Sequence, residues 1–487
     1  MLVLVKRKMG LFFLSFLLIC LIPFELHSQA EFPNTPAGIR GQQIMDLLNG
    51  KLKIEPKEFV KQNCSQSFKD RVPKNQWGGL LKQLINMSSS FKLIKINKSE
   101  DDKIDFVIQL TSNKMYMTVA ATVEKSLPNL ISGMMFAPGE NNSEENTTKV
   151  KNVVGTETEN VKKIKDYIAE LAKQDKFSGS ILVAKKGEIL LQETLGYADK
   201  RFKVANKLDT KFNLGSLNKS FTTVAILQLV EEDKIGIDDP IGKYLNYFPK
   251  DIADKVTIRQ LLNMSSGWGD YWFNKYYLQH KDELRTVSQY MEFIKNIPLD
   301  FEPGTRMEHS NIGFEVAGAI IEKVSGMDYY NYVRENIYKT AGMMNSDSYD
   351  RDSPVENLAV GYTNDNVMDT IKTGWQWENT YILSPKGTPA GGGYSTTEDM
   401  LKYDNALRNG KLISKDYFNF MNNRFKGNIG DPFVAQRVLR SAGGAPGVST
   451  FYARDMKNGF TIIVLSNYDH PVGIDVGNEI IKMLGLN

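Results

Sequence analysis

The stretch NLGSLNKSFTTVAILQLVEED, residues 213–233, places Ser216 three residues before Lys219. The apolar spacing that follows predicts an amphipathic helix, on which residues three apart share a face. Ser216 in the first turn would lie near free backbone N–H groups and the positive end of the helix dipole, which favour developing negative charge. A partly buried Lys219 would have a lowered pKa and could accept a proton. The stretch therefore predicts a serine nucleophile beside its activating amine, although two polar residues at a helix end fit the same short pattern.

The Ser-x-x-Lys spacing also occurs a second time, at Ser89 and Lys92. That copy runs into residues that alternate as a strand does, so we interpret it as carrying no chemistry. The pattern at Ser216 needs support from the rest of the chain.

That support comes from segments that follow in a fixed order. They are DDPIGKYLNYFP (238–249), VTIRQLLNMSSGW (256–268), FEPGTRMEHSNIGFEVAG (301–318), PAGGGYSTTEDM (389–400), GGAPGVSTF (443–451) and GFTIIVLSN (459–467). In this order and spacing, residues 160–485 resemble the serine β-lactamase-related family, which includes class C β-lactamases, DD-peptidases, D-aminopeptidases and esterases. The resemblance implies an acyl-enzyme mechanism with Ser216 as nucleophile and Lys219 as its base.

The second motif of this family, Tyr-x-Asn, falls on His309-Ser310-Asn311. Asn311 keeps the amide that orients the lysine or holds the substrate. Histidine replaces the tyrosine, which works in the family as general acid or base near the leaving group. An imidazole titrates near pH ~6.5 and is a competent replacement. The alternative is an inert hydrogen-bonding residue in a decayed site.

The third motif, Lys-Thr-Gly or His-Thr-Gly, falls on Ser441-Ala442-Gly443, so the expected cation is missing. A hydroxyl at Ser441 discriminates far less between an acid and a neutral ligand than a cation does. The backbone N–H groups of Ser216 and Gly444 match the family's oxyanion-hole positions. A literal Lys-Thr-Gly at residues 372–374 precedes the AGGGYSTTEDM segment, and we interpret it as a loop outside the site.

The fold class predicted is α+β. Residues 161–487 would form a β-lactamase/transpeptidase-like antiparallel sheet beside a helical region, with hairpins turning at Lys186-Gly187 and near residues 457–459. Residues 31–138 read as a small α+β domain that resembles modules related to nuclear transport factor 2. Residues 139–160 are polar and without apolar periodicity, and we expect a linker there.

Residues 1–30 have the features of a secretory signal: a basic start, an apolar core of about 16 residues and small residues at 28–30. An uncleaved anchor is the alternative, but no stable membrane span is expected after cleavage. The localisation predicted is periplasmic or extracellular, with a membrane-anchored form possible.

The remaining composition excludes several classes of function. The formal net charge is +3, of which the first 30 residues carry +2, so there is no electrostatic case for nucleic acid. Cys20 lies in the signal, and Cys64 reads as a small core residue, so no intramolecular disulfide is expected. Neither HExxH nor CxxC occurs, so we expect no metal site and no cofactor.

The sequence therefore predicts an exported serine hydrolase acting on a small ester or amide, or on a peptidoglycan-like substrate. The missing cation favours an ester or an uncharged amide. The alternative is a catalytically decayed binding protein of the cell envelope.

Overall fold

The computed structural model describes residues 31–71, 78–88, 90–111, 116–138, 157–272, 274–364, 376–433 and 438–486. The chain divides into two compact units, Met1–Lys149 and Val150–Asn487. Each unit has its own hydrophobic core, and each is described by itself.

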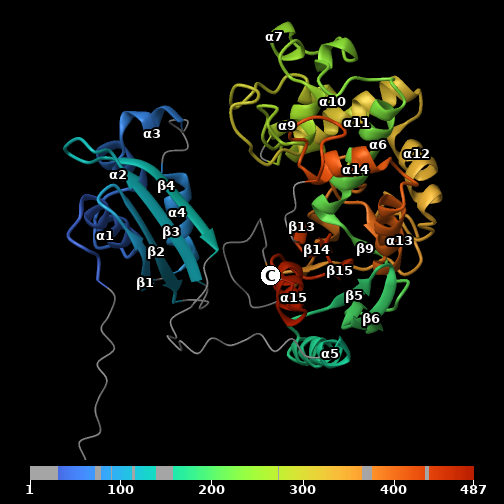
Figure 1. Cartoon of the computed structure of the whole chain (residues 1–487), viewed down its shortest axis with the longest axis horizontal. Helices are drawn as coiled ribbons and strands as arrows, with labels where there is room; N and C mark the ends of the chain where they lie inside the picture. Colours follow the sequence, from blue (N-terminus) through green and yellow to red (C-terminus); the bar gives the residue numbers. More distant parts are fainter. Residues whose placement is uncertain are drawn as a thin grey trace, which may run out of the picture. The chain divides into compact units, whose positions relative to one another are not determined.

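The smaller unit is a meander sheet covered by helices (Figure 1). Its helices are α1 (Pro36–Leu48), α2 (Pro56–Asn63), α3 (Gln66–Arg71) and α4 (Gly79–Met87). Its strands β1 (Phe91–Ser99), β2 (Lys103–Leu110), β3 (Tyr116–Val123) and β4 (Ile131–Pro138) pair antiparallel in that order. The helices followed by a meander agree with the α+β expectation, while the relation to nuclear transport factor 2 stays a prediction.

Cys64 lies at the end of α2 with its side chain fully buried in this core. Burial raises the pKa of its thiol to about 12, so the reactive thiolate is disfavoured. Cys64 is therefore a core residue, as the sequence predicts.

The larger unit is built on a five-stranded antiparallel sheet in the order β13-β14-β15-β5-β6. These strands span Gly179–Lys185 (β5), Glu188–Leu195 (β6), Val438–Ala445 (β13), Val448–Asp455 (β14) and Phe460–Ser466 (β15). The order confirms a sheet whose edges come from the two ends of the domain. The β5–β6 hairpin turns at Lys186 and Gly187, both with positive φ, as a two-residue hairpin turn requires.

The two faces of this sheet are covered by different helices (Figure 1). α5 (Glu157–Lys173) and α15 (Val472–Met483) pack on one face, where Ile164, Ile181, Val464 and Ile480 are buried together. The last four residues of the expected linker, 157–160, belong to α5, because Glu157 and Glu159 in its first turn favour a helix start there.

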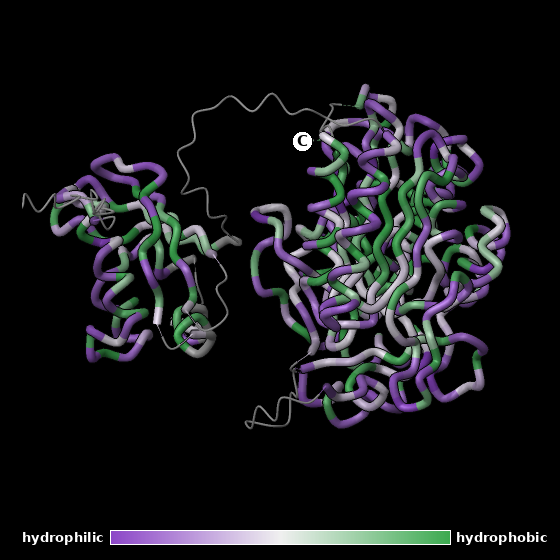
Figure 2. The backbone as a smooth tube through the Cα atoms, turned by 90° about the horizontal axis from the view of Figure 1, so that it is seen from below, coloured by the Kyte–Doolittle hydropathy of each residue, from purple (hydrophilic) through white to green (hydrophobic). Residues whose placement is uncertain are grey.

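The helical region covers the other face. Its helices are α6 (Lys219–Glu231), α7 (Lys250–Ala253), α8 (Ile258–Leu262), α9 (Lys275–His280), α10 (Val287–Ile294), α11 (Ile312–Ser325), α12 (Tyr329–Val333), α13 (Thr397–Arg408) and α14 (Lys415–Asn422). Short strands complete it: β7 (Tyr197–Asp199), β8 (Val204–Ala205), β9 (Phe212–Asn213), β10 (Tyr362–Thr363), β11 (Trp377–Glu378) and β12 (Tyr394–Ser395). In Figure 2 hydrophobic segments run through the interior of this unit and hydrophilic ones lie at its periphery.

The helix expected to be amphipathic, α6, is buried almost all round. It lies at the centre of the helical region, in contact with α11 and α12. Apolar residues at helical spacing predict that one face of a helix is buried, but they do not exclude burial of its other faces. The sequence of α6 also contains a continuous apolar run, which is typical of a helix that is buried on all sides. The prediction of an amphipathic helix was therefore wrong, and the reactive residues at its start lie deeper than the pattern implied.

Candidate active site

Ser216 lies in a short 3-10 turn, η1 (Gly215–Asn218), that leads into α6. Gly215 has φ +51°, a conformation that favours glycine over residues with a side chain. The turn is held from two sides: Leu214 N–H donates to Gly393 O (2.7 Å), and Thr450 Oγ1 donates to Leu214 O (2.8 Å). The serine is thus presented by a fixed turn between the sheet and the helical region.

Lys219 is the first residue of α6 and is only 5% exposed. Its Nζ lies 3.2 Å from Ser216 Oγ and 2.5 Å from Asn311 Oδ1, and it also donates to Ala390 O. Burial lowers the pKa of this amine to about 8, while the negative charges of Asp270 and Glu315 oppose that shift. About a tenth of the amine is therefore neutral at pH 7, and this fraction reaches about a half at pH 8.

The contacts of Lys219 also orient its lone pair. The two carbonyl oxygens, from Asn311 and Ala390, accept hydrogen bonds and cannot donate them. A neutral amine that donates to both has its lone pair left for the hydroxyl of Ser216. The arrangement favours transfer of the serine proton to Lys219.

Asn311 and His309 come from the segment that precedes α11. Asn311 is the N-cap residue of α11 and is buried, with its amide oxygen on Lys219. His309 is 51% exposed at its side chain and lines the same cavity as Ser216. Its Nδ1 lies 3.0 Å from Asp270 Oδ2. The structure therefore places Asn311 against Lys219 and places His309 in the wall of the cavity that Ser216 also lines.

Ser441, Gly443 and Gly444 lie on β13, the edge strand of the sheet, and line the cavity opposite the helices. A methyl group on Gly443 would lie 2.8 Å from Ser216 N and 2.2 Å from Leu214 O. A methyl group on Gly215 would lie 3.0 Å from Gly444 N. The strand thus approaches the serine turn so closely that only glycine fits, and it brings the N–H groups of Ser216 and Gly444 near each other.

Two acidic residues near the site escaped the sequence analysis. Asp270 lies in the aromatic loop after α8, and Glu315 is fully buried in the first turn of α11. Tyr271 Oη donates to Glu315 Oε1 (3.0 Å), and burial raises the pKa of this carboxyl to about 7. Glu315 follows Asn311 by four residues, so helical spacing alone could have placed it on the site's face.

The cavity around Ser216 has a volume of about 1360 Å³ and a largely aromatic and aliphatic wall. The loop after α8 contributes Tyr271 and Trp272 to this wall, and α9 contributes Tyr277. Trp272 is 39% exposed and Tyr381, which also lines the cavity, is 82% exposed. Apolar side chains are therefore presented to whatever enters.

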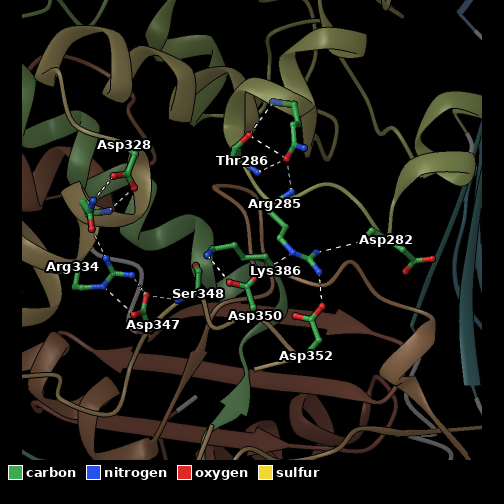
Figure 3. A network of polar contacts seen from close by, with 12 residues as sticks. Asp282, Arg285, Thr286, Asp328, Arg334, Asp347, Ser348, Asp350, Asp352 and Lys386 are labelled. Atoms are coloured by element: carbon green, nitrogen blue, oxygen red, sulfur yellow. Dashed lines mark hydrogen bonds and ion pairs between the residues drawn. The ribbon is translucent and has the colours of Figure 1, made fainter. Parts of the chain in front are cut away.

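Three of the cations that line the cavity, Lys281, Lys386 and Arg454, are paired with acidic residues, and Arg424 and Arg440 also line it, with exposed side chains. Lys386 Nζ lies 2.9 Å from Asp350, within a network that also joins Arg285 to Asp352 (Figure 3). Lys281 pairs with Asp282, and the buried Arg454 pairs with Asp404. These pairs leave each of the three cations less able to bind a substrate carboxylate.

The Lys-Thr-Gly at residues 372–374 and Ser89 lie outside the described residues, as do the expected signal and residues 139–156 of the expected linker. Among the described residues, no cluster of three or more His, Cys, Asp or Glu has the arrangement of a metal site. None of the described helices combines the length and the apolarity that crossing a bilayer requires.

With this geometry established, comparison with known proteins identifies the family. The Beta-lactamase family model matches residues 164–484, from α5 to the end of α15. The chain belongs to the Beta-lactamase family.

Individual relatives support the same assignment. The chain is 32% identical over 327 residues to penicillin-binding protein 4* of Bacillus subtilis (strain 168), covering 63% of this chain and 71% of the relative. The crystal structure of a penicillin binding protein from Bacillus halodurans is 27% identical with a TM-score of 0.58, covering 65% of this chain and 99% of that one. A D-amino acid amidase from Ochrobactrum anthropi SV3, 24% identical with a TM-score of 0.56 over 68% of this chain and 97% of its own, shares the fold. The β-lactamase-like fold and the resemblance found in the sequence are thus confirmed.

Proposed function

We propose that this chain is an exported serine hydrolase that forms an acyl-enzyme on Ser216 and hydrolyses a small ester or uncharged amide. The observation that carries the proposal is the position of Lys219, which is buried, has a pKa lowered to about 8 and lies 3.2 Å from Ser216 Oγ. A site that keeps an amine in this state is prepared to remove the serine proton.

In acylation, neutral Lys219 takes the proton of Ser216 while Oγ bonds to the substrate carbonyl carbon. The N–H groups of Ser216 and Gly444 stabilise the oxyanion that forms. The bond to the leaving group breaks as the proton passes from Lys219, through His309, to the leaving oxygen or nitrogen. In deacylation a water gives its proton to His309, and Ser216 Oγ recovers one as the acyl group leaves, so the net protonation of the site is unchanged.

The wall of the cavity supports an apolar, uncharged substrate. Ser441 stands where the family has a cation, and Lys281, Lys386 and Arg454 are paired with carboxylates. Trp272 and Tyr381 offer aromatic surface instead, which stabilises apolar groups by removing them from water. An ester with an aliphatic or aromatic acyl group fits these surroundings better than the free carboxylate of a penicillin or a D-Ala terminus.

Export rests on the basic start, apolar core and small residues of positions 1–30. Fractionation of cells that express the full chain, with N-terminal sequencing of the released protein, tests it. Release of a chain that begins after residue 30 supports export, and a cytoplasmic chain that retains Met1 contradicts it.

The activity is tested with a panel of nitrophenyl esters of increasing acyl length, D-amino-acid amides and a chromogenic cephalosporin. We expect the esters to be turned over fastest and intact-mass spectrometry to show an acyl adduct on Ser216. Equal hydrolysis rates for the parent protein and Ser216→Ala would contradict the proposal.

The alternative, a decayed binding protein, predicts a different result with a fluorophosphonate probe. A nucleophilic Ser216 is labelled covalently, whereas a decayed site is not. The intact contact of Ser216, Lys219 and Asn311 favours labelling.

A further inference from the structure

We propose that Asp270 is a positioning residue that fixes the tautomer of His309, so that Nε2 is the nitrogen that carries protons in the reaction of Ser216. This inference rests on the proposed function, since it assigns the group that makes His309 work in that reaction. Neither residue of this pair belongs to the Ser-x-x-Lys motif, and the sequence did not single out Asp270.

The first observation is that the two oxygens of the Asp270 carboxylate have different partners. Oδ2 lies 3.0 Å from His309 Nδ1, and Oδ1 accepts the backbone N–H of Asn311 at 3.2 Å. A carboxylate only accepts hydrogen bonds, so this contact requires a proton on Nδ1. Neutral His309 then has its lone pair on Nε2, which is the form that can take a proton from the reaction.

The second observation is that the two segments are joined at several points. Ser310 Oγ donates to Gly269 O (3.1 Å), and Ser310 Oγ in turn accepts the N–H of Gly313 (2.9 Å). The N–H of Glu308 donates to Met264 O (2.9 Å). The loop that carries Asp270 is therefore held against the segment that carries His309, and the carboxylate does not depend on the imidazole for its position.

The third observation is the exposure of the pair. The side chains of His309 and Asp270 are 51% and 32% exposed. Ion pairs this accessible to water add little to the stability of a fold. The main consequence of the contact is therefore to fix the orientation of the imidazole ring and the nitrogen that carries its proton. A catalytic role requires both to be fixed.

In the reaction, His309 Nε2 accepts the proton of the attacking water while the water oxygen bonds to the acyl carbon. The imidazolium that results has one N–H on Asp270 and the other free to donate. As the bond from the acyl carbon to Ser216 Oγ breaks, Nε2 returns the proton to Oγ, and the acid product leaves. The carboxylate of Asp270 stabilises the transient cation throughout and is never protonated itself.

The hydrogen bond from the backbone N–H of Asn311 to Asp270 predicts a specific effect of Asp270→Asn. The backbone N–H of Asn311 requires an acceptor, so the amide oxygen of the new side chain will take the place of Oδ1. Its NH₂ group then faces His309 Nδ1, which must become an acceptor, and the imidazole proton moves to Nε2. The substitution thus inverts the tautomer with almost no change in shape.

The experiment combines ester hydrolysis with ¹⁵N NMR of the imidazole nitrogens in the full chain, which has four histidines. We expect Nδ1–H in the parent and Nε2–H in Asp270→Asn, with kcat/KM reduced about 10²-fold or more. In a His309→Ala background, Asp270→Asn should change kcat/KM by no more than about threefold, because the group it positions is gone. The effect of Asp270 on the charge of Lys219 is present in both backgrounds and cancels in the comparison.

Glu308→Gln is the matched control, because Glu308 is the residue before His309 but pairs with Arg306. In this variant, both the tautomer of His309 and kcat/KM should equal those of the parent protein. An equal loss from Asp270→Asn in both backgrounds, or an Nε2–H tautomer in the parent, overturns the inference. The tautomer is measured without turnover, so a failure of the inference is distinguished from a failure of the proposed function, which Ser216→Ala reports.

Discussion

The two walls of the cleft contribute different kinds of groups. The helical wall, from η1, α6 and α11, supplies reactive side chains that are buried and held by several hydrogen bonds, as Lys219 and Asn311 are. The strand wall, β13, supplies backbone N–H groups and glycines, with Ser441 in place of a cation. Under the proposed function, the groups that would form the acyl-enzyme and the groups that would select the substrate lie on different walls, so the two properties can change separately.

The largest effect is expected at the helical wall, from Lys219→Met. Removing the base should lower kcat/KM for the best ester about 10²–10⁴-fold. Burst-phase kinetics with a nitrophenyl ester measure the acylation step directly. Lys173→Met, at the exposed end of α5, is the control and should behave as the parent. A full burst in Lys219→Met would mean that another group activates Ser216.

The strand wall is tested next by Gly443→Ala. The added methyl group would lie 2.2 Å from Leu214 O and 2.6 Å from Thr450 Oγ1, so β13 must move away from the serine turn. We expect kcat to fall about 10²-fold as the oxyanion donors separate, with a lowered Tm.

The control for this glycine is Gly79→Ala, where a methyl group meets nothing within 4 Å. It should leave kcat and Tm unchanged. Unchanged kcat in Gly443→Ala would show that the oxyanion is held elsewhere.

A smaller effect is expected from Ser441→Lys, which restores the cation of the third motif. A hydrogen bond to a charged group contributes about 1.5–3 kcal/mol, so substrates with a carboxylate near the scissile bond should gain about tenfold or more in kcat/KM. Neutral esters should change little. Turnover of a cephalosporin beside a neutral ester of similar size measures this change. An equal gain for both would contradict the separation of the two walls.

The smallest effect is a change in pH dependence, from Glu315→Gln. The charge of Glu315 raises the pKa of Lys219, so its removal should move the acidic limb of the kcat/KM profile to lower pH. The profile of the parent should rise through pH 8 as Lys219 loses its proton, since its pKa is lowered to about 8. If the acidic limb of the kcat/KM profile lies at the same pH in Glu315→Gln as in the parent, Glu315 does not affect the pKa of Lys219.

The same substitution has a predictable effect on stability. The carboxyl of Glu315 has its pKa raised by burial to about 7, above the unfolded value. The folded protein therefore holds a proton that the unfolded chain releases, and the stability from this group falls as pH rises from about 4.5 to 7. Glu315→Gln should raise Tm more at pH 9, where Lys219 is neutral, than at pH 4.5. Equal shifts at both values would contradict the raised pKa.

Much of the fold could be predicted because its signals are local. The hairpin at Lys186-Gly187 is a case, since the turn needs positive φ at both residues and the flanking strands alternate. The burial of α6 could not be predicted, because the elements that cover its polar positions come from distant parts of the chain. The start of α5 at Glu157 was missed because polar helix ends resemble linkers in composition.

By itself, the sequence determined the identity and order of the candidate reactive groups, and the absence of a cation at the third motif. These candidates are Ser216, Lys219, His309 and Asn311, with Ser441 in place of the cation. These follow from residue types at fixed spacing, which local chain geometry converts into shared faces and turns. Only the tertiary structure decided the state of those groups. Burial sets the pKa of Lys219, and Asp270 and Glu315 reach the site from a loop and from the first turn of α11, which no motif marks. The physical reason is that electrostatic and desolvation effects depend on distances between segments far apart in the chain, which appear only once those segments pack together.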